Sequence, residues 1–129
     1  MTKCYLTVGS NDLDVSFAFY DPVMSALETK VAADYPGMTR SYMMPDGFQL
    51  WVTKPQNGEA AAGGNGHTAG FHTAGTGQVD AAHAAALANG DTDEGAPGPR
   101  PLYGPDIYAA YARDPFGNKL AFMTSTDTE

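Results

Sequence analysis

Few residues of this chain could carry chemistry, and two of them stand out by their setting. His72 closes a strand-like segment and could exchange a proton near neutral pH, or it could cap the turn that follows. Arg100 lies between two prolines in PGPRPLYGP, where a preorganised guanidinium group suits a carboxylate or a phosphate. The same group could instead pin its own loop to a nearby acidic residue. Each residue therefore has both a ligand-binding and a structural interpretation.

Aromatic side chains supply a second group of candidates. Tyr42 and Trp51 could stack on a planar ligand, or they could pack between neighbouring strands. Further cleft candidates with aromatic or cationic side chains are Arg40, Tyr103, Tyr108 and Tyr111.

Other reactive residue types are better explained by structure. His83 lies on the apolar stripe of an Ala-rich helical segment, which is typical of a hydrogen-bonded structural histidine, and Asp114 opens the turn sequence DPFGN. Cys4 alternates with Leu6 and Val8, which predicts a small core residue and not a reactive thiol. The sequence has no Ser/His/Asp set, phosphate loop or CxxC, so no covalent mechanism is predicted.

Length and charge restrict the class of protein. A chain of 129 residues is expected to form one domain. The net charge of −8 argues against a nucleic-acid groove, which needs clustered Lys and Arg. No apolar run reaches membrane length, and the first residues lack the apolar core of a signal peptide. We therefore expect a cytoplasmic protein without nucleic-acid or membrane partners.

The hydrophobic pattern predicts the same order of elements twice. The first half has a strand at 3–9, a helix at 15–30 with a kink near Pro22, a weak strand at 31–34, and strands at 39–44 and 48–53. After a Gly- and Ala-rich connection come a strand at 67–73, a helix at 78–89 stopped by Gly90, a loop at 91–106, and strands at 107–113 and 119–124.

Three stretches of this pattern resemble a known family. They are YLTVGSNDLDVSFAFYDPVMSAL, GNGHTAGFHTAGTGQVDAAHAAALANGDTDEGAPGPRPLY and YAAYARDPFGNKLAFM. In this order they resemble the glyoxalase / bleomycin-resistance / extradiol-dioxygenase superfamily, also called vicinal oxygen chelate. The resemblance implies an α+β fold in which two βαβββ modules form an open cup-shaped mixed sheet with the helices outside. The single domain would divide into module one (about 1–54), a linker (55–66) and module two (about 67–129).

Strand alternation divides the side chains between the two faces of that sheet. The apolar sets Cys4/Leu6/Val8, Phe48/Leu50/Val52, Ala69/Phe71 and Leu120/Phe122 suit the helix side. Their alternates should line the cup, and they are Tyr5, Thr7, Gln49, Trp51, Thr53, Thr68, Gly70, His72, Lys119, Ala121 and Met123. Hydroxyls, aromatic rings and small residues together suit a small organic ligand.

The resemblance also locates four metal-ligand positions, usually His or Glu in relatives. They fall at Tyr5, at Gln49 or Trp51, at Thr68 and at Ala121, and none of these carries an imidazole or a carboxylate. We therefore expect no metal and no cofactor. His67 precedes Thr68, but turning it inward would slip the strand by one residue and turn Phe71 outward, so a loop or outer-face position is favoured.

The leading hypothesis is a member of this superfamily that binds a small organic molecule in the cup without the usual metal ligands, with or without catalysis. The alternative is a glyoxalase-like lyase or isomerase whose atypical divalent-metal site includes His67 or His72. A third hypothesis is a domain without a ligand that serves in dimer contacts. The resemblance implies a homodimer. The candidate ligand-binding residues are Tyr5, Thr7, Tyr42, Gln49, Trp51, Thr68, His72, Arg100, Tyr103, Tyr108 and Ala121.

Overall fold

The computed structural model describes residues 4–89 and 92–126. Its elements are β1 (Tyr5–Gly9), α1 (Leu13–Ala26), β2 (Lys30–Tyr35), β3 (Thr39–Met43), β4 (Gln49–Thr53), β5 (Ala69–His72), α2 (Thr76–Ala88), β6 (Thr92–Pro99), the short 3-10 helix η1 (Pro101–Tyr103), β7 (Ile107–Arg113) and β8 (Lys119–Ser125). No helix in these two ranges has the length and apolar character needed to cross a membrane.

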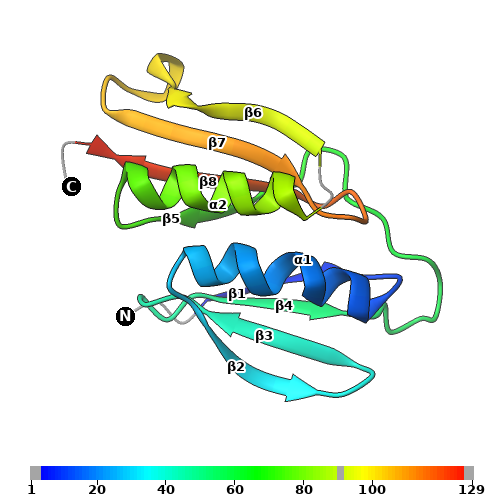
Figure 1. Cartoon of the computed structure of the whole chain (residues 1–129). Helices are drawn as coiled ribbons and strands as arrows, with labels where there is room; N and C mark the ends of the chain where they lie inside the picture. Colours follow the sequence, from blue (N-terminus) through cyan, green and yellow to red (C-terminus); the bar gives the residue numbers. More distant parts are fainter. Residues whose placement is uncertain (1–3, 90–91, 127–129) are drawn as a thin grey trace.

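The strands form two four-stranded mixed sheets with the same topology. Their orders are β1-β4-β3-β2 and β5-β8-β7-β6, and in each sheet the first strand pairs in parallel with the last strand of its module. Figure 1 shows α1 and α2 side by side on one face of both sheets, with β1 and β5 as neighbouring edges. The expected α+β fold of two βαβββ modules is confirmed. The face away from the helices is called the open face below.

Helix α1 follows from its N-cap and its apolar spacing. The side chain of Asp12 accepts hydrogen bonds from the backbone N–H groups of Asp14 and Val15. The helix continues through Pro22 and ends earlier than predicted, because Glu28 takes a positive φ of 59° and turns the chain into β2.

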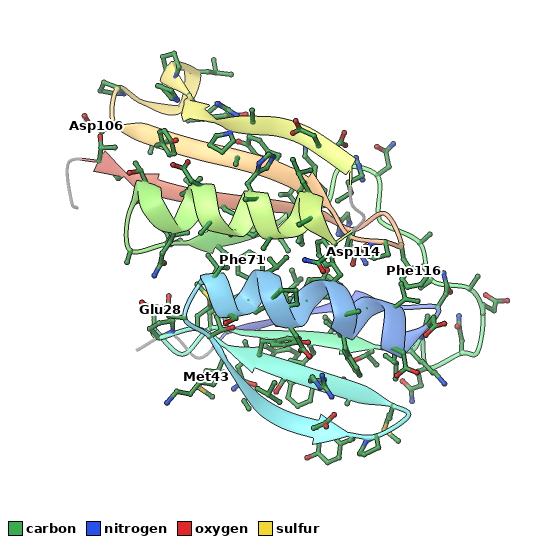
Figure 2. The ribbon with its side chains drawn as sticks, viewed as in Figure 1. Glu28, Met43, Phe71, Asp106, Asp114 and Phe116 are labelled. Carbon is green, nitrogen blue, oxygen red and sulfur yellow. The ribbon has the colours of Figure 1, made fainter. Side chains whose placement is uncertain are left out.

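One hydrophobic core lies between the helices and the sheets and includes residues of both modules. The ring of Phe71 in β5 packs edge-on against the ring of Phe48 from module one, with 6.0 Å between their centroids, and stacks on the ring of Phe122 in β8, with 6.1 Å between centroids. Figure 2 shows Phe71 and Asp114 near the junction of the modules. The open face is thus supported by a core that neither module completes alone.

Polar contacts also join the modules. The buried Asp114 carboxylate, in the β7–β8 turn, accepts hydrogen bonds from Tyr20 Oη of α1 (2.6 Å) and from Asn118 Nδ2 (2.7 Å). Asn118 Nδ2 also donates to the carbonyl oxygen of Gly9 at 3.0 Å. The predicted turn role of Asp114 is confirmed, because its Oδ1 accepts from the N–H groups of Phe116 and Asn118.

Two local predictions were wrong. The segment predicted as a loop at 91–106 contains β6, an edge strand rich in Gly and Pro that pairs with β7 in an interrupted register. Proline is tolerated there because the outer edge of an edge strand needs no N–H donor. Cys4 is exposed and precedes β1, so it does not join the core. The predicted stop at Gly90 lies outside the described residues.

Candidate functional site

The open face of module one carries the largest group of predicted site residues. Strand pairing sets Tyr5 beside Gln49 and Thr7 beside Trp51. A shallow hollow of about 570 Å³ is lined by Tyr5, Thr7, Thr39, Gln49, Trp51 and Thr53 and is called the module-one hollow. Sequence reasoning omitted Thr39, although its place opposite Thr53 in the 39–53 hairpin could have revealed it.

Most polar groups of this hollow have no protein partner. The side chains of Tyr5, Thr7, Gln49 and Trp51 make no hydrogen bond within the part of the chain that the structure describes. Tyr5 is 68% exposed, so its phenol reaches solvent. The hollow therefore offers aromatic surface together with unused donors and acceptors.

A buried hydroxyl lies on the strand next to Trp51. Ser41 lies opposite Trp51 in the β3–β4 pair, on the same face, and its side chain is inaccessible to solvent. Its Oγ has no hydrogen-bond partner among the described residues. An unpaired buried hydroxyl costs free energy, but Ser41 does not line the module-one hollow, so this group is not counted among its ligand contacts.

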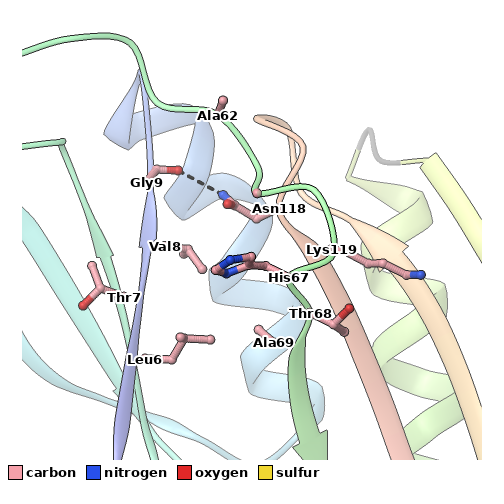
Figure 3. A pocket seen from close by; sticks show the side chains of 11 residues that line it. Leu6, Thr7, Val8, Gly9, Ala62, His67, Thr68, Ala69, Asn118 and Lys119 are labelled. Atoms are coloured by element: carbon pink, nitrogen blue, oxygen red, sulfur yellow. Dashed lines mark hydrogen bonds between the residues drawn. The ribbon is translucent and has the colours of Figure 1, made fainter.

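A second cavity, of about 280 Å³, lies at the seam between β1 and β5. Figure 3 shows the His67 ring pointing into this seam from the loop before β5, whereas the Lys119 side chain extends away from it. The ring packs so closely on Gly64 that a Cβ added there would lie 2.8 Å from His67 Cδ2. His67 remains in a loop, as predicted, yet its ring reaches the seam without slipping β5.

The four positions where the resemblance expects metal ligands carry a phenol (Tyr5), an amide or an indole (Gln49 or Trp51), a hydroxyl (Thr68) and a methyl group (Ala121). Thr68 lines the seam, and Ala121 is buried opposite Gly70. Within residues 4–89 and 92–126, no three His, Cys, Asp or Glu side chains gather as they would around an ion. Divalent ions prefer carboxylate, imidazole or thiolate ligands, so this donor set does not fit one.

Comparison with known proteins settles the family. The model of the Glyoxalase/Bleomycin resistance protein/Dioxygenase superfamily matches residues 5–122. The chain belongs to this superfamily. A glyoxalase/bleomycin resistance protein from Albidiferax ferrireducens T118 is similar with 39% identity and a TM-score of 0.82, over 95% of this chain and 97% of that one.

More distant structures share the fold. A glyoxalase-related enzyme from Fulvimarina pelagi is 21% identical with a TM-score of 0.73, covering 96% of this chain and 88% of that one. A lactoylglutathione lyase from Agrobacterium tumefaciens is 19% identical with a TM-score of 0.68, covering 97% and 94%. The comparison with curated proteins gave no match.

His72 of this superfamily member lies apart from the module-one hollow. It lines a separate depression of about 160 Å³ with Met44, Asp46 and Phe48. The histidine is exposed and makes no side-chain hydrogen bond within the described residues. The structure therefore does not bring His72 beside Trp51.

Arg100 uses its guanidinium group on its own loop. Nη1 donates to the carbonyl oxygens of Gly98 (3.0 Å) and Pro99 (3.2 Å), and Nη2 donates to that of Ala96 (2.7 Å). Arg100 therefore pins its own loop, but its hydrogen-bond partners are backbone carbonyl oxygens and not the acidic side chain that the sequence suggests. Tyr103, on η1, is 67% exposed and lines none of the three hollows described above.

Tyr42, Tyr108 and Arg40 were expected in the cleft, but they lie on the helix side. Tyr42 Oη donates to Asp21 Oδ1 of α1 at 2.6 Å, and burial, followed by this hydrogen bond, raises the pKa of the phenol. Tyr108 Oη donates to Asp80 of α2 at 2.6 Å. The reason is alternation, because Tyr42 is adjacent to the open-face residue Ser41 and must point the other way.

Arg40 follows the same rule. Its guanidinium donates to Asp21 and Asp34 and lies 3.9 Å from the centroid of the Phe17 ring of α1. His83 has the structural role predicted for it: it is 5% exposed, and its Nε2 lies 3.1 Å from Asp93 Oδ1.

Proposed function

We propose that this superfamily member binds a small planar organic molecule in the module-one hollow, without a divalent metal at the superfamily's position. The observation that carries the proposal is Trp51, half-buried at the centre of an open sheet face among unpaired polar groups. A planar ligand would stack on the indole ring, and Gln49 and Thr7 would bind its polar atoms.

The donor chemistry supports the metal-independent form of the proposal. Divalent ions prefer carboxylate, imidazole or thiolate ligands, and the four expected positions supply none of these groups. Sequestration of the ligand and a metal-independent reaction on it are both compatible with this site. Tyr5 contributes an exposed phenol to the hollow.

A glyoxalase-like lyase or isomerase with an atypical metal is the second candidate. One observation favours it: the His67 ring points into the seam beside Thr68 (Figure 3). A single imidazole does not make a metal site, so this candidate needs ligands that the geometry does not supply.

The binding test uses the chain's one tryptophan as its reporter. N-phenyl-1-naphthylamine, a neutral planar probe, is titrated while the quenching of Trp51 and the emission of the probe are followed. Lost stacking on Trp51→Ala should cost about 1–2 kcal/mol, a roughly five- to thirtyfold loss of affinity by probe emission. Leu102→Ala, which removes an apolar side chain that is 86% exposed on η1, should bind as the parent does.

The metal test repeats the titration after EDTA treatment and again with added Zn²⁺, Ni²⁺ or Mn²⁺. We expect the same affinity in all cases, and less than one equivalent of metal per purified chain by elemental analysis. Binding that depends on an added ion would favour the lyase or isomerase. A probe that fails to bind, or that ignores Trp51→Ala, would overturn the proposed site.

A further inference from the structure

The two sheets meet at strand edges that do not pair with each other. β1 is an edge strand of one sheet and β5 of the other, and within the described residues no strand pairing joins the two sheets. Figure 1 shows the two edges as neighbours. An unpaired strand edge presents backbone N–H and C=O groups that need hydrogen-bond partners. The seam between β1 and β5 is therefore lined by backbone donors and acceptors.

The hydrogen bonds around β1 show which of its backbone groups face the seam. Gln49 N–H donates to the carbonyl oxygen of Cys4, so the backbone carbonyl of that residue points toward β4. The carbonyl oxygen of Gly9 points away from β4 and accepts a hydrogen bond from Asn118 Nδ2 at 3.0 Å. Successive residues of a strand direct their backbone groups to opposite edges. Thr7, two residues before Gly9, therefore presents its N–H and C=O to the seam.

The cavity of about 280 Å³ at this seam, called the seam cavity, lies beside Thr7. In Figure 3 the Thr7 side chain lies on the far side of β1 from the His67 ring, so the backbone of Thr7 is the part that lines the cavity. Outside the β1–β4 pairing, this backbone makes no hydrogen bond to another backbone group in the part of the chain that the structure describes.

The opposite wall of the seam cavity is built in the same way. Thr73 N–H donates to the carbonyl oxygen of Met123, so the backbone of Thr73 points toward β8. By the same alternation Gly70 directs its backbone groups away from β8, toward the seam. Thr68, two residues before Gly70, lines the seam cavity. Backbone groups of Thr7 and Thr68 thus approach the cavity from opposite sides.

Side chains add one polar group and an apolar wall to the seam cavity. The His67 ring points into the cavity (Figure 3), and its nitrogens have no hydrogen-bond partner within residues 4–89 and 92–126. Leu6, Val8 and Ala69 supply apolar lining. A ligand that fits this cavity needs an apolar part as well as groups that pair with backbone edges.

Contacts around the seam cavity keep the two edges apart. Asn11 Nδ2 donates to the carbonyl oxygen of Ala61 at 3.0 Å, and Ala61 N–H donates to Asn11 Oδ1 at 2.6 Å. This pair fixes the linker, whose next residues Ala62 and Gly64 line the cavity. The Asn118 side chain bridges the modules through its bond to Gly9. The cavity is therefore preorganised, which lowers the entropic cost of binding.

We infer that the seam cavity is a second binding site, for a small molecule that carries a secondary amide and an apolar substituent. The N–H and C=O of a trans amide point to opposite sides, so one pairs with the β1 edge and the other with the β5 edge, as in an added strand. The second lone pair of the amide oxygen accepts a hydrogen bond from His67. The volume equals that of about nine waters in the liquid, which suits a ligand of about ten non-hydrogen atoms. This site does not rest on the proposed function.

Two probes of nearly the same shape test the inference. N-methylbenzamide carries the secondary amide, and methyl benzoate replaces its N–H by an oxygen. Each is titrated into the ¹⁵N-labelled full chain by NMR. The backbone amide signals of Thr7 and Thr68 should shift with N-methylbenzamide, and the ester should bind roughly threefold more weakly or worse, because it lacks the donor.

Amide hydrogen exchange reads the strand edge directly. In the free protein the N–H of Thr7 should exchange faster than those of Leu6 and Val8, which the alternation directs toward β4. Saturating N-methylbenzamide should slow the exchange of Thr7 by roughly threefold or more, because it pairs with that edge.

A side-chain variant provides an independent readout. His67→Ala should weaken N-methylbenzamide about two- to tenfold, the effect of one lost hydrogen bond. His72→Ala, which removes an exposed imidazole from the separate depression beside Asp46, is the matched control and should bind as the parent does.

Three outcomes would overturn the seam site. They are unshifted Thr7 and Thr68 signals, equal affinities of the amide and the ester, and binding that is lost in Trp51→Ala but kept in His67→Ala. The last result would place the probe in the module-one hollow. N-phenyl-1-naphthylamine tests that hollow separately, so failure of one site leaves the other standing.

Discussion

Tyr20→Phe tests one of the buried contacts that join the two modules. Tyr20 Oη of α1 donates to Asp114 Oδ2 of the β7–β8 turn at 2.6 Å, and the two residues are 0% and 3% exposed. The change keeps the ring, so it opens no cavity. Asp114 keeps its hydrogen bonds from Phe116 N, Asn118 N and Asn118 Nδ2.

The magnitude follows from these contacts. A hydrogen bond to a charged group contributes about 1.5–3 kcal/mol. Asp114 keeps three of its four hydrogen bonds in the variant, so we expect the free energy of unfolding to fall by about 1.5–2 kcal/mol. For a chain of this length each kcal/mol lowers Tm by roughly 3–5 °C, which predicts a fall of about 5–10 °C.

The assay is thermal and urea unfolding of the variant beside Tyr103→Phe, which removes a hydroxyl from a residue that is 67% exposed. A double-mutant cycle with Asp114→Ala should give a coupling free energy of about 1–2 kcal/mol between the two modules. If Tyr20→Phe shifts Tm no more than the control, or if the two changes are additive, the reasoning about this contact is wrong.

Three further predictions follow from other parts of the chain. Gly63→Ala should destabilise the protein by about 2 kcal/mol or more in urea unfolding, because the added Cβ would overlap a backbone carbonyl of the β7–β8 turn. Gly77→Ala, in open space within α2, should stabilise the protein by up to about 1 kcal/mol. Equal effects of the two changes would contradict this reasoning. The hydrogen bond from Gly95 N–H, and then His83, lowers the pKa of Asp93 below its ordinary 3.8, so its stabilising contribution is present above about pH 4 and is lost as the pH falls through the lower folded value. In Asp93→Ala the free energy of unfolding should therefore fall less steeply as the pH is lowered below about 4. The same steepness in the variant and the parent would refute the assignment. Sedimentation at micromolar concentration should give a homodimer, as we propose from family membership, and a species of only 13.5 kDa would count against it.

The local elements and the two sheet faces were readable from sequence because their causes are local. Successive residues of a strand point to opposite faces of the sheet. The period of two was therefore enough to place Trp51 and Thr7 on one face and Leu50 and Val52 on the other. Asp114 in an Asp-Pro turn acts through hydrogen bonds with its nearest neighbours. The unusual residues at the family's ligand positions were likewise visible in the sequence itself.

Non-local pairing decided the rest. Tyr42 obeys the alternation, but the group that accepts the hydrogen bond from its hydroxyl, Asp21, lies 21 residues away and is brought there by the packing of α1 on the sheet. β6 exists because β7 supplies its hydrogen bonds, which outweigh the weak strand propensity of Gly and Pro. The carbonyls that hold Arg100, the seam around His67 and the Tyr20–Asp114 bond across 94 residues all depend on how separate segments pack. Side-chain chemistry and spacing do not encode such contacts individually, because they are set by the free energy of the whole packed chain.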